Sequence, residues 1–164
     1  MIGDGNGWVR DPDGSRYWGR FGAAGLLVTA GAVADGTAED GPVVLLQHRA
    51  AWSHQGGTWS VPGGARDSHE SASDAALREA GEEAGLDPAA VQIMSELVTA
   101  RSVAGWTYTT VLARVEGRPA LIPNAESLEL AWVPLDTVDT LPLHPAFAAA
   151  WPRLRPMVAG AQPG

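Results

Sequence analysis

The chain of 164 residues contains no cysteine. This absence excludes disulfide bonds, thiolate metal sites and cysteine nucleophiles, and it leaves the redox compartment open. Lysine is absent as well, because all 11 basic residues are arginines. Any contact between a basic side chain and a phosphate group must therefore come from the planar fork of a guanidinium.

Long apolar runs are also missing. No stretch approaches the ~18 apolar residues that a membrane-spanning helix needs, and residues 1–10 lack the basic and apolar regions of a signal peptide. Positive charge is scarce, since 11 basic residues against 19 acidic ones give a net charge of -8. Such a surface repels nucleic-acid polymers, but a small anion can bind when metal ions accompany it. We therefore expect a soluble cytoplasmic protein with a small-molecule partner and with neither a membrane nor a nucleic-acid partner.

What is present predicts one domain that mixes strands and helices. The length suits one domain, and 45% hydrophobic residues is an ordinary globular content. The elements follow no βαβ regularity, so we expect an α/β fold of the mixed kind, a mixed sheet flanked by helices. We expect residues 1–19 to be an irregular lead-in, residues 20–156 to form the domain and residues 157–164 to be a frayed tail. Predicted strands span 25–30, 43–48, 58–61, 91–100, 106–115 and 130–133; predicted helices span 71–84 and 145–154, the second interrupted near Pro152.

The helix predicted over 71–84 carries three glutamates on one face. Ser71 and Asp74 fit a capping box at its start, and the glycine after Ala84 fits its end. At about 100° per residue, the glutamates at 79, 82 and 83 fall within an arc of roughly 100°. Like charges at this spacing repel one another unless a hard cation such as Mg²⁺ lies among them. A solvated acidic face is the alternative reading of three glutamates alone.

The spacing around this face decides between the two readings. Residues 64–86 follow the pattern G-x5-E-x7-R-E-U-x-E-E-x-G-U, where U is apolar. This pattern resembles the Nudix box, and only Ala80 is a weak match, because it is barely apolar. Flanking segments are similar to those of the same family: W-S-V-P-G-G at 59–64, L-L-Q-H-R at 45–49 and W-V-P-L-D at 132–136. The matching box residues are Gly64, Glu70, Arg78, Glu79, Ala80, Glu82, Glu83, Gly85 and Leu86.

The resemblance implies a Nudix fold and a metal-dependent hydrolysis of a nucleoside diphosphate linked to another group. In that reading Glu82 and Glu83 are the principal ligands of Mg²⁺, for which Mn²⁺ can substitute, and Glu79 and the carbonyl of Gly63 assist them. Glu79 is also the candidate base that activates water. Arg78 and Glu70 orient the carboxylates. Many relatives recruit one further glutamate from outside the box, and we favour Glu126 over Glu129 for that place.

Four residues outside the box are candidates for substrate binding. Arg20 and Arg49 lie near the ends of the first two strands and could grip a phosphate, although either could equally be a surface residue. His144 could read the edge of a base or could cap the second helix. Trp18 could offer a stacking face, as could Tyr17, Trp52, Trp59 and Trp106, although aromatic residues belong to the core by default.

The substrate class follows from elimination among Nudix groups. No proline occurs between Pro88 and Pro119, where sugar-nucleotide hydrolases carry one, and the signatures of the NADH and coenzyme A groups are absent. The chain therefore resembles the MutT-type group, which hydrolyses nucleoside triphosphates, oxidised dGTP included, to monophosphate and pyrophosphate. Dinucleoside polyphosphates or a specialised nucleotide are the alternative substrates. A non-catalytic Nudix module is disfavoured by the complete box, and the isomerase of isopentenyl diphosphate by the lack of cysteine. A homodimer is expected in preference to a monomer, since relatives commonly pair.

Overall fold

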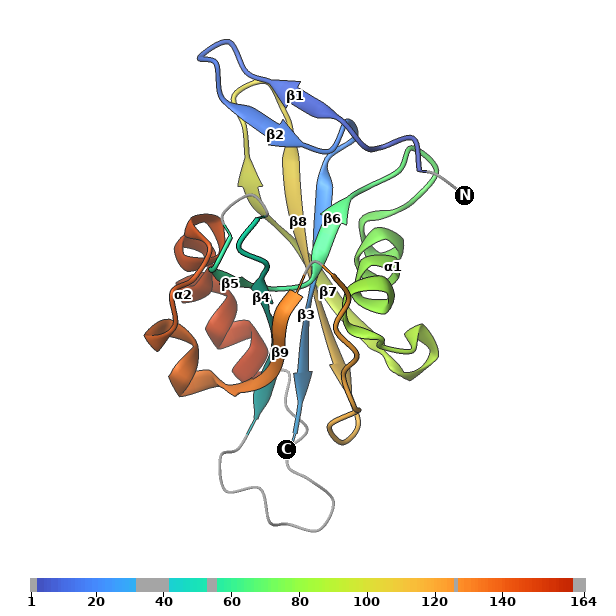
Figure 1. Ribbon diagram of the computed structural model, residues 1–164, viewed down its shortest axis with the longest axis vertical. Helices are drawn as coiled ribbons and strands as arrows, with labels where there is room; N and C mark the ends of the chain where they lie inside the picture. The colour runs from blue at the N-terminus through green and yellow to red at the C-terminus, as the bar shows by residue number, and fades with distance from the viewer. Residues whose placement is uncertain (1–2, 32–41, 53–55, 126, 161–164) are drawn as a thin grey trace.

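A mixed β-sheet forms the centre of the molecule, with one long helix on each face (Figure 1). The computed structural model describes residues 3–31, 42–52, 56–125 and 127–160. The strand order is β5-β4-β3-β8-β7, with β6 paired to β3 and β9 paired to β4. This confirms the expected fold class. The strands of this sheet are β3 (Ala23–Ala30), β4 (Val43–Arg49), β5 (Trp59–Ser60), β6 (Gly63–Ala65), β7 (Gln92–Arg101), β8 (Thr107–Val115) and β9 (Ser127–Pro134).

Strands β3 and β4 are largely buried on both faces, because helices cover both sides of the sheet. Successive side chains of a strand point to opposite faces, so neighbouring residues enter different cores. Leu26 packs in the core beneath the first helix, whereas Leu27 packs in the core beneath the second. β3 runs parallel to β8 and antiparallel to β4, with which it pairs at two residue positions.

Helix α1 (Ala72–Ala84) forms as the capping signals predict. Ser71 accepts a hydrogen bond from the backbone of Asp74 and Asp74 accepts one from the backbone of Ser71, which completes the capping box. Gly85 ends the helix in the left-handed conformation, with φ of 73°, where a residue without a β-carbon meets no steric cost. Four small residues pack α1 closely on the sheet: Ala75, Ala76, Ala80 and Ala84.

Helix α2 (Pro145–Gly160) covers the opposite face and is longer than expected. It continues through Pro152 and Pro156, so the predicted interruption is wrong, and so is a frayed tail for residues 157–160. Both prolines are exposed, so the backbone carbonyls that lose a helical partner face water rather than the core. Leu154 and Val158 are buried and fix the helix on the sheet. Residues 161–164 of the predicted tail lie outside the described residues.

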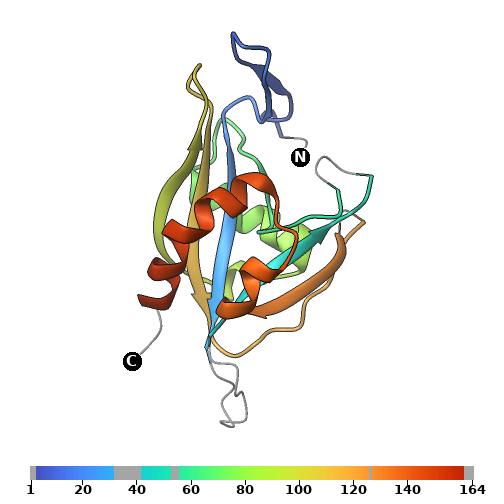
Figure 2. The ribbon, with the colours of Figure 1, turned by 90° about the vertical axis from the view of Figure 1, so that its left-hand side faces the viewer.

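The expected irregular lead-in is instead a small hairpin. Strands β1 (Trp8–Arg10) and β2 (Arg16–Trp18) pair antiparallel in a sheet of their own, with Trp8 opposite Trp18. Figure 2 shows this hairpin standing beyond the end of the main sheet, on the side away from the end of α2. The density of glycine and aspartate in this segment favours a loop, but cross-strand pairing between aromatic residues stabilises the hairpin.

Two short 3₁₀ turns complete the chain, η1 (Pro88–Ala90) and η2 (Leu135–Thr140). Within the residues that the structure describes, neither helix is long and apolar enough to cross a membrane.

Candidate active site

Two carboxylates of α1, those of Glu79 and Glu83, lie against the two glycines of β6. The backbone amide of Gly63 donates a hydrogen bond to Oε2 of Glu83 at 3.0 Å, and Glu83 is almost wholly buried. A β-carbon placed on Gly64 would lie 2.6 Å from the Glu79 carboxylate, which leaves no room for a side chain there. The Gly63–Gly64 pair thus lets the β6 backbone approach the carboxylate face directly.

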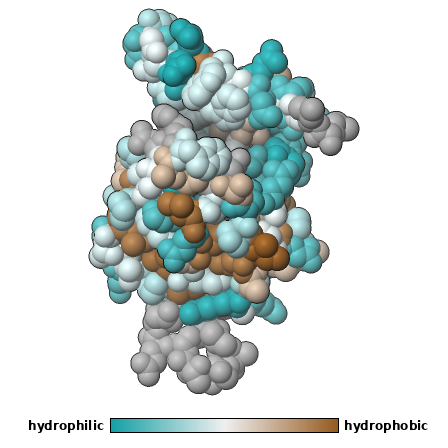
Figure 3. Space-filling view, in the orientation of Figure 1, coloured by the Kyte–Doolittle hydropathy of each residue, from teal (hydrophilic) through white to brown (hydrophobic). Residues whose placement is uncertain are grey.

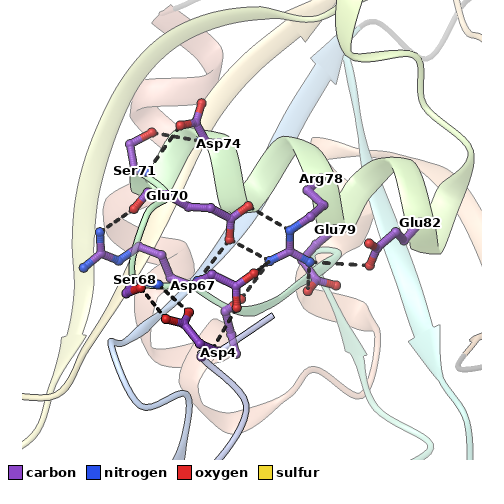
Figure 4. Close-up of polar contacts among 12 residues, drawn as sticks. Asp4, Asp67, Ser68, Glu70, Ser71, Asp74, Arg78, Glu79 and Glu82 are labelled. Atoms are coloured by element: carbon purple, nitrogen blue, oxygen red, sulfur yellow. Dashed lines mark hydrogen bonds and ion pairs between the residues drawn. The ribbon is translucent and has the colours of Figure 1, made fainter. Parts of the chain in front are cut away.

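Arg78 holds the acidic residues of the site together (Figure 4). Its Nε and Nη2 atoms each donate to one oxygen of Glu70 at 2.8 Å, the forked geometry that suits a carboxylate. Its Nη1 atom donates to Glu79 at 2.9 Å and lies 3.5 Å from a Glu82 oxygen. Asp67 lies 3.9 Å away on the other side. One guanidinium therefore neutralises part of the charge of four carboxylates.

The ionisation of Glu70 and Arg78 follows from this contact. The hydrogen bonds from Arg78 hold the pKa of the buried Glu70 carboxyl below its ordinary value, although burial alone would raise it. The same bonds to Glu70 raise the pKa of Arg78, so the pair stays charged at any working pH. Glu70 also accepts from the backbone amide of Asp67 at 3.0 Å, which fixes the loop before the helix. An orienting role of Arg78 and Glu70 requires such contacts, and that role stays a prediction.

The donor set fits a hard divalent cation. Glu79, Glu82 and Glu83 line one cleft with the Gly63 backbone, and Glu82 remains 57% exposed at its side chain. Within the described part of the chain, no group of three or more acidic or histidine side chains is arranged so that it could hold a metal ion by itself. Mg²⁺ seldom needs such a group, because it keeps several waters and binds one or two carboxylates together with substrate phosphates.

The cleft beside α1 has a volume of about 1150 Å³. Its acidic wall consists of the α1 carboxylates and Arg78, and side chains of the hairpin and of the segment after β4 line it as well. A cleft of this size can hold a nucleotide, since ligand pockets commonly measure about 300–1,000 Å³. Trp18, Arg49 and His144 all line it, so the structure brings three of the four predicted substrate residues together.

The other predicted residues lie elsewhere. Arg20 lines a separate, smaller hollow together with Phe21, and it does not reach the main cleft. Glu129 is exposed on β9, opposite His48 in the sheet, and it does not line the cleft either. Glu126, the preferred extra metal ligand, lies outside the described residues.

For His144, the structure shows the capping alternative and also places the ring at the cleft. Its Nδ1 atom accepts a hydrogen bond from the backbone amide of Ala146 at 3.1 Å, in the first turn of α2, so the histidine caps the helix. The same residue borders the cleft. Because Nδ1 accepts, a neutral ring carries its proton on Nε2, which makes that atom a donor.

Two residues of the site carry no signal in the sequence. Tyr108 lines the cleft, and a β-carbon on Gly63 would lie 2.8 Å from its hydroxyl. Burial raises the pKa of the Tyr108 phenol, and the nearby Glu83 carboxylate raises it further. Asp67 is buried beside Arg78 at a position that the box pattern leaves free. In the sequence, Tyr108 is only one residue of a predicted strand. Asp67 is only one of several acidic residues in predicted loops.

Known proteins share this architecture. A solved Nudix hydrolase from M. smegmatis, RenU, superposes with a TM-score of 0.89 at 50% identity, over 98% of this chain and 99% of that one. An Ap4A hydrolase from C. elegans matches with a TM-score of 0.66 over 84% of this chain and 98% of that one. Because the two sequences are 20% identical, this match supports the fold only.

Sequence relatives agree with the structural ones. A protein of Mycobacterium tuberculosis named "Putative 8-oxo-dGTP diphosphatase 3" is 55% identical over 94% of this chain and 71% of its own length. A Bifidobacterium longum "Nucleoside triphosphate pyrophosphatase/Nudix hydrolase fusion protein" is 40% identical over 91% of this chain and 30% of its own length. The NUDIX domain model matches residues 25–156, which include the box, α1, most of α2 and the whole main sheet except the first residues of β3. The chain therefore belongs to the Nudix family and is a Nudix hydrolase.

Proposed function

We propose that this hydrolase is a Mg²⁺-dependent pyrophosphohydrolase that cleaves a nucleoside triphosphate to the monophosphate and pyrophosphate. The observation that carries the proposal is one cleft with two unlike walls. The α1 carboxylates that could hold a metal ion form its acidic wall, and the rest of its lining includes tryptophans and arginines that suit a nucleotide. Nudix enzymes act on small nucleotides with divalent metal ions, and these walls meet both needs.

Each side chain of the acidic wall has a place in this reaction. Glu82, Glu83 and the Gly63 carbonyl would hold the metal ion, which when bound lowers the pKa of water and neutralises charge on the phosphates. Glu79 would accept the proton of the attacking water. Arg78 keeps Glu79 in position through the 2.9 Å hydrogen bond, and the fork to Glu70 keeps Arg78 in position.

Oxidised dGTP is the substrate that we favour within this class. The 55% identical relative from M. tuberculosis carries an 8-oxo-dGTP diphosphatase name, and the identity extends over 94% of this chain. His144 and Arg49 border the cleft and could contact the base edge and the phosphates respectively. A relative's name indicates a class of substrate. The assay must therefore compare closely related nucleotides within that class.

The test is a hydrolysis assay of the purified protein with Mg²⁺. The substrates are dGTP, 8-oxo-dGTP, the other nucleoside triphosphates, Ap4A and ADP-ribose, with pyrophosphate and phosphate measured separately. We expect 8-oxo-dGTP or another triphosphate to be preferred and pyrophosphate to be released. Glu82→Gln should reduce kcat by about 10²–10³-fold, as removal of one group that stabilises transition-state charge commonly does.

Glu116→Gln is the matched control, because Glu116 is an exposed glutamate outside the cleft. Its activity should equal that of the unsubstituted protein. Preference for Ap4A or ADP-ribose would retain the hydrolase and reject the triphosphate substrate. Turnover that survives Glu82→Gln undiminished would reject the metal role of the acidic wall.

A further inference from the structure

The N-terminal hairpin is fastened to the catalytic domain at three points, so it is a fixed wall of the cleft. Asp11 is buried at the start of its turn and accepts hydrogen bonds from the amides of Val103 and Ala104 at 3.0 and 3.3 Å. Trp106 donates its Nε1 hydrogen to the Gly19 carbonyl at 3.1 Å. These two contacts hold the hairpin to the turn between β7 and β8.

The third point joins the hairpin to the loop that precedes α1. The amide of Gly5 donates to Oδ1 of Asp67 at 2.8 Å. A β-carbon on Gly3 would lie 2.1 Å from an Asp67 oxygen, and one on Gly5 would lie 2.1 Å from the Arg66 carbonyl. Residues 3–5 therefore lie flat against the loop that carries Asp67, with no space for side chains on these two glycines. We call residues 3–5 the strap.

The two faces of the hairpin differ in chemistry. On one face Tyr17 stacks on Trp106, with ring centroids 4.8 Å apart and planes 25° apart, and this contact packs the hairpin onto the domain. The strand register places Trp8 opposite Trp18 and Arg10 opposite Arg16, all on the other face. We call those four residues the Trp–Arg face.

The Trp–Arg face is prepared for an anionic aromatic ligand. Trp8 and Trp18 meet edge to face with centroids 5.1 Å apart, and they remain 47% and 43% exposed. The Arg16 guanidinium lies 4.8 Å above the Trp8 ring. Two arginines so close together stand out on a protein with a net charge of -8. In Figure 3 the upper part of the molecule is mostly teal to pale, whereas most brown residues gather lower, over β9 and the segment before it.

From this arrangement we propose that the Trp–Arg face binds the nucleobase end of the substrate. Trp8, Arg16 and Trp18 line the same cleft as Glu79 and Glu82, so one nucleotide can place its phosphates at α1 and its base at the hairpin. The two tryptophans supply the stacking surface, and Arg16 faces the base edge or the first phosphate. This inference rests on the proposed function, since it assigns the base subsite of that same cleft.

Calorimetric titration with two probes tests the inference. The probes are dGMP, which carries a base, and inorganic pyrophosphate, which does not. Trp8→Ala and Trp18→Ala should each weaken dGMP binding by about 10-fold, the loss expected for one stacking surface, and leave pyrophosphate binding unchanged. In hydrolysis of dGTP the same variants should raise KM and leave kcat nearly constant, a split that a general loss of structure would not give.

Two control variants are matched to the tested residues. Phe21→Ala removes an exposed aromatic ring and Arg101→Gln removes an exposed arginine, and both residues lie outside the main cleft. Both should bind dGMP normally, whereas Arg16→Gln should not.

Three outcomes would change this assignment. Normal dGMP affinity in Trp8→Ala and Trp18→Ala would overturn the inference. So would a change from dimer to monomer in sedimentation with dGMP affinity intact, because it would assign the face to a second copy of the chain. Weaker dGMP binding in a protein that does not hydrolyse dGTP would keep the base subsite and reject the triphosphate substrate.

Discussion

The two walls of the cleft are built in opposite ways. The acidic wall comes almost entirely from one continuous segment, residues 63–83, whose glutamates share one face because α1 is helical. The other wall, by which we mean the rest of the lining, includes residues of the hairpin, Trp52 after β4, Trp106 before β8 and His144 before α2. Chemistry that depends on one helix is encoded by spacing, whereas recognition in this cleft depends on long-range packing. The residues for the chemistry can therefore be predicted from a sequence pattern, whereas the residues for recognition cannot.

Asp67 is the residue where the two walls meet. One of its oxygens accepts from the Gly5 amide of the strap, and the other lies 3.9 Å from Arg78. Substitutions in the acidic wall and substitutions in the strap or hairpin should therefore have different effects on activity and on ligand binding.

After Glu82→Gln, Arg78→Lys should have the largest effect on activity, and it should act through the acidic wall. Lysine cannot reproduce the two bonds to Glu70 together with the bond to Glu79, because it lacks the planar fork. We expect kcat/KM to fall by about 10–100-fold, as loss of a residue that orients metal ligands typically causes. Steady-state kinetics with varied Mg²⁺ checks this. Arg114→Lys, on a partly exposed arginine bonded to Gln92, is the control and should be neutral. An Arg78→Lys enzyme with full activity would show that charge alone suffices.

Asp67→Ala should loosen the connection between the walls. The Gly5 amide loses its acceptor, and a buried donor without a partner costs about 1–3 kcal/mol. The free energy of unfolding in urea should fall by that amount, and dGMP affinity should fall with it because the strap positions the hairpin. Ser68→Ala removes a neighbouring side-chain contact to Asp4 that is exposed, and it should cost much less. Equal losses in the two variants would contradict the special place of Asp67.

Tyr108→Phe should produce a smaller, purely functional effect. The ring is retained, so packing is preserved, and only the hydroxyl beside Gly63 is lost. If that hydroxyl donates one neutral hydrogen bond to the bound substrate, kcat/KM should fall by about 5-fold. Kinetics together with an unchanged melting temperature would establish this. A lower melting temperature with normal kinetics would instead assign Tyr108 to packing.

The pH dependence of stability should report the Glu70–Arg78 pair. The folded pKa of Glu70 is lowered by Arg78 from its ordinary value of 4.5, so the unfolded chain takes up a proton first as pH falls. The stabilisation is complete above that ordinary value and disappears as pH falls below it, through the lowered folded pKa. Glu70→Gln should therefore lose melting temperature at pH 7 and show a shallower decline below pH 4.5. Glu116→Gln should decline like the unsubstituted protein; an identical slope in all three would refute the assignment.

Elements with their own signals could be predicted from the sequence. The capping box of Ser71 and Asp74 and the glycine after Ala84 define both ends of α1 without reference to the rest of the molecule. β3 and β4 could be predicted because apolar runs of their length suit a strand buried on both faces. The carboxylate face then follows from helical geometry.

Elements that depend on remote partners could not be predicted. The hairpin strands have three residues each, and their anchor at Val103 and Ala104 is more than 90 positions from Asp11. β6 contains Gly-Gly-Ala, which has no β propensity, and it exists because β3 offers a partner. The position of Arg20 next to β3 predicts contact with the substrate, but the turn before that strand directs this residue to the smaller hollow.

The four-carboxylate environment of Arg78 also determines how this enzyme can be handled. Many small metalloproteins unfold when a chelator removes the ion, because their site does not form without it. In this enzyme a permanent cation, covalently part of the chain, already sits among Asp67, Glu70, Glu79 and Glu82. We therefore expect that folding does not depend on the proposed metal ion. A preparation kept in EDTA should stay folded, and mixing it with nucleotide and then with Mg²⁺ would start all molecules at one moment, as time-resolved crystallography and rapid-quench kinetics require.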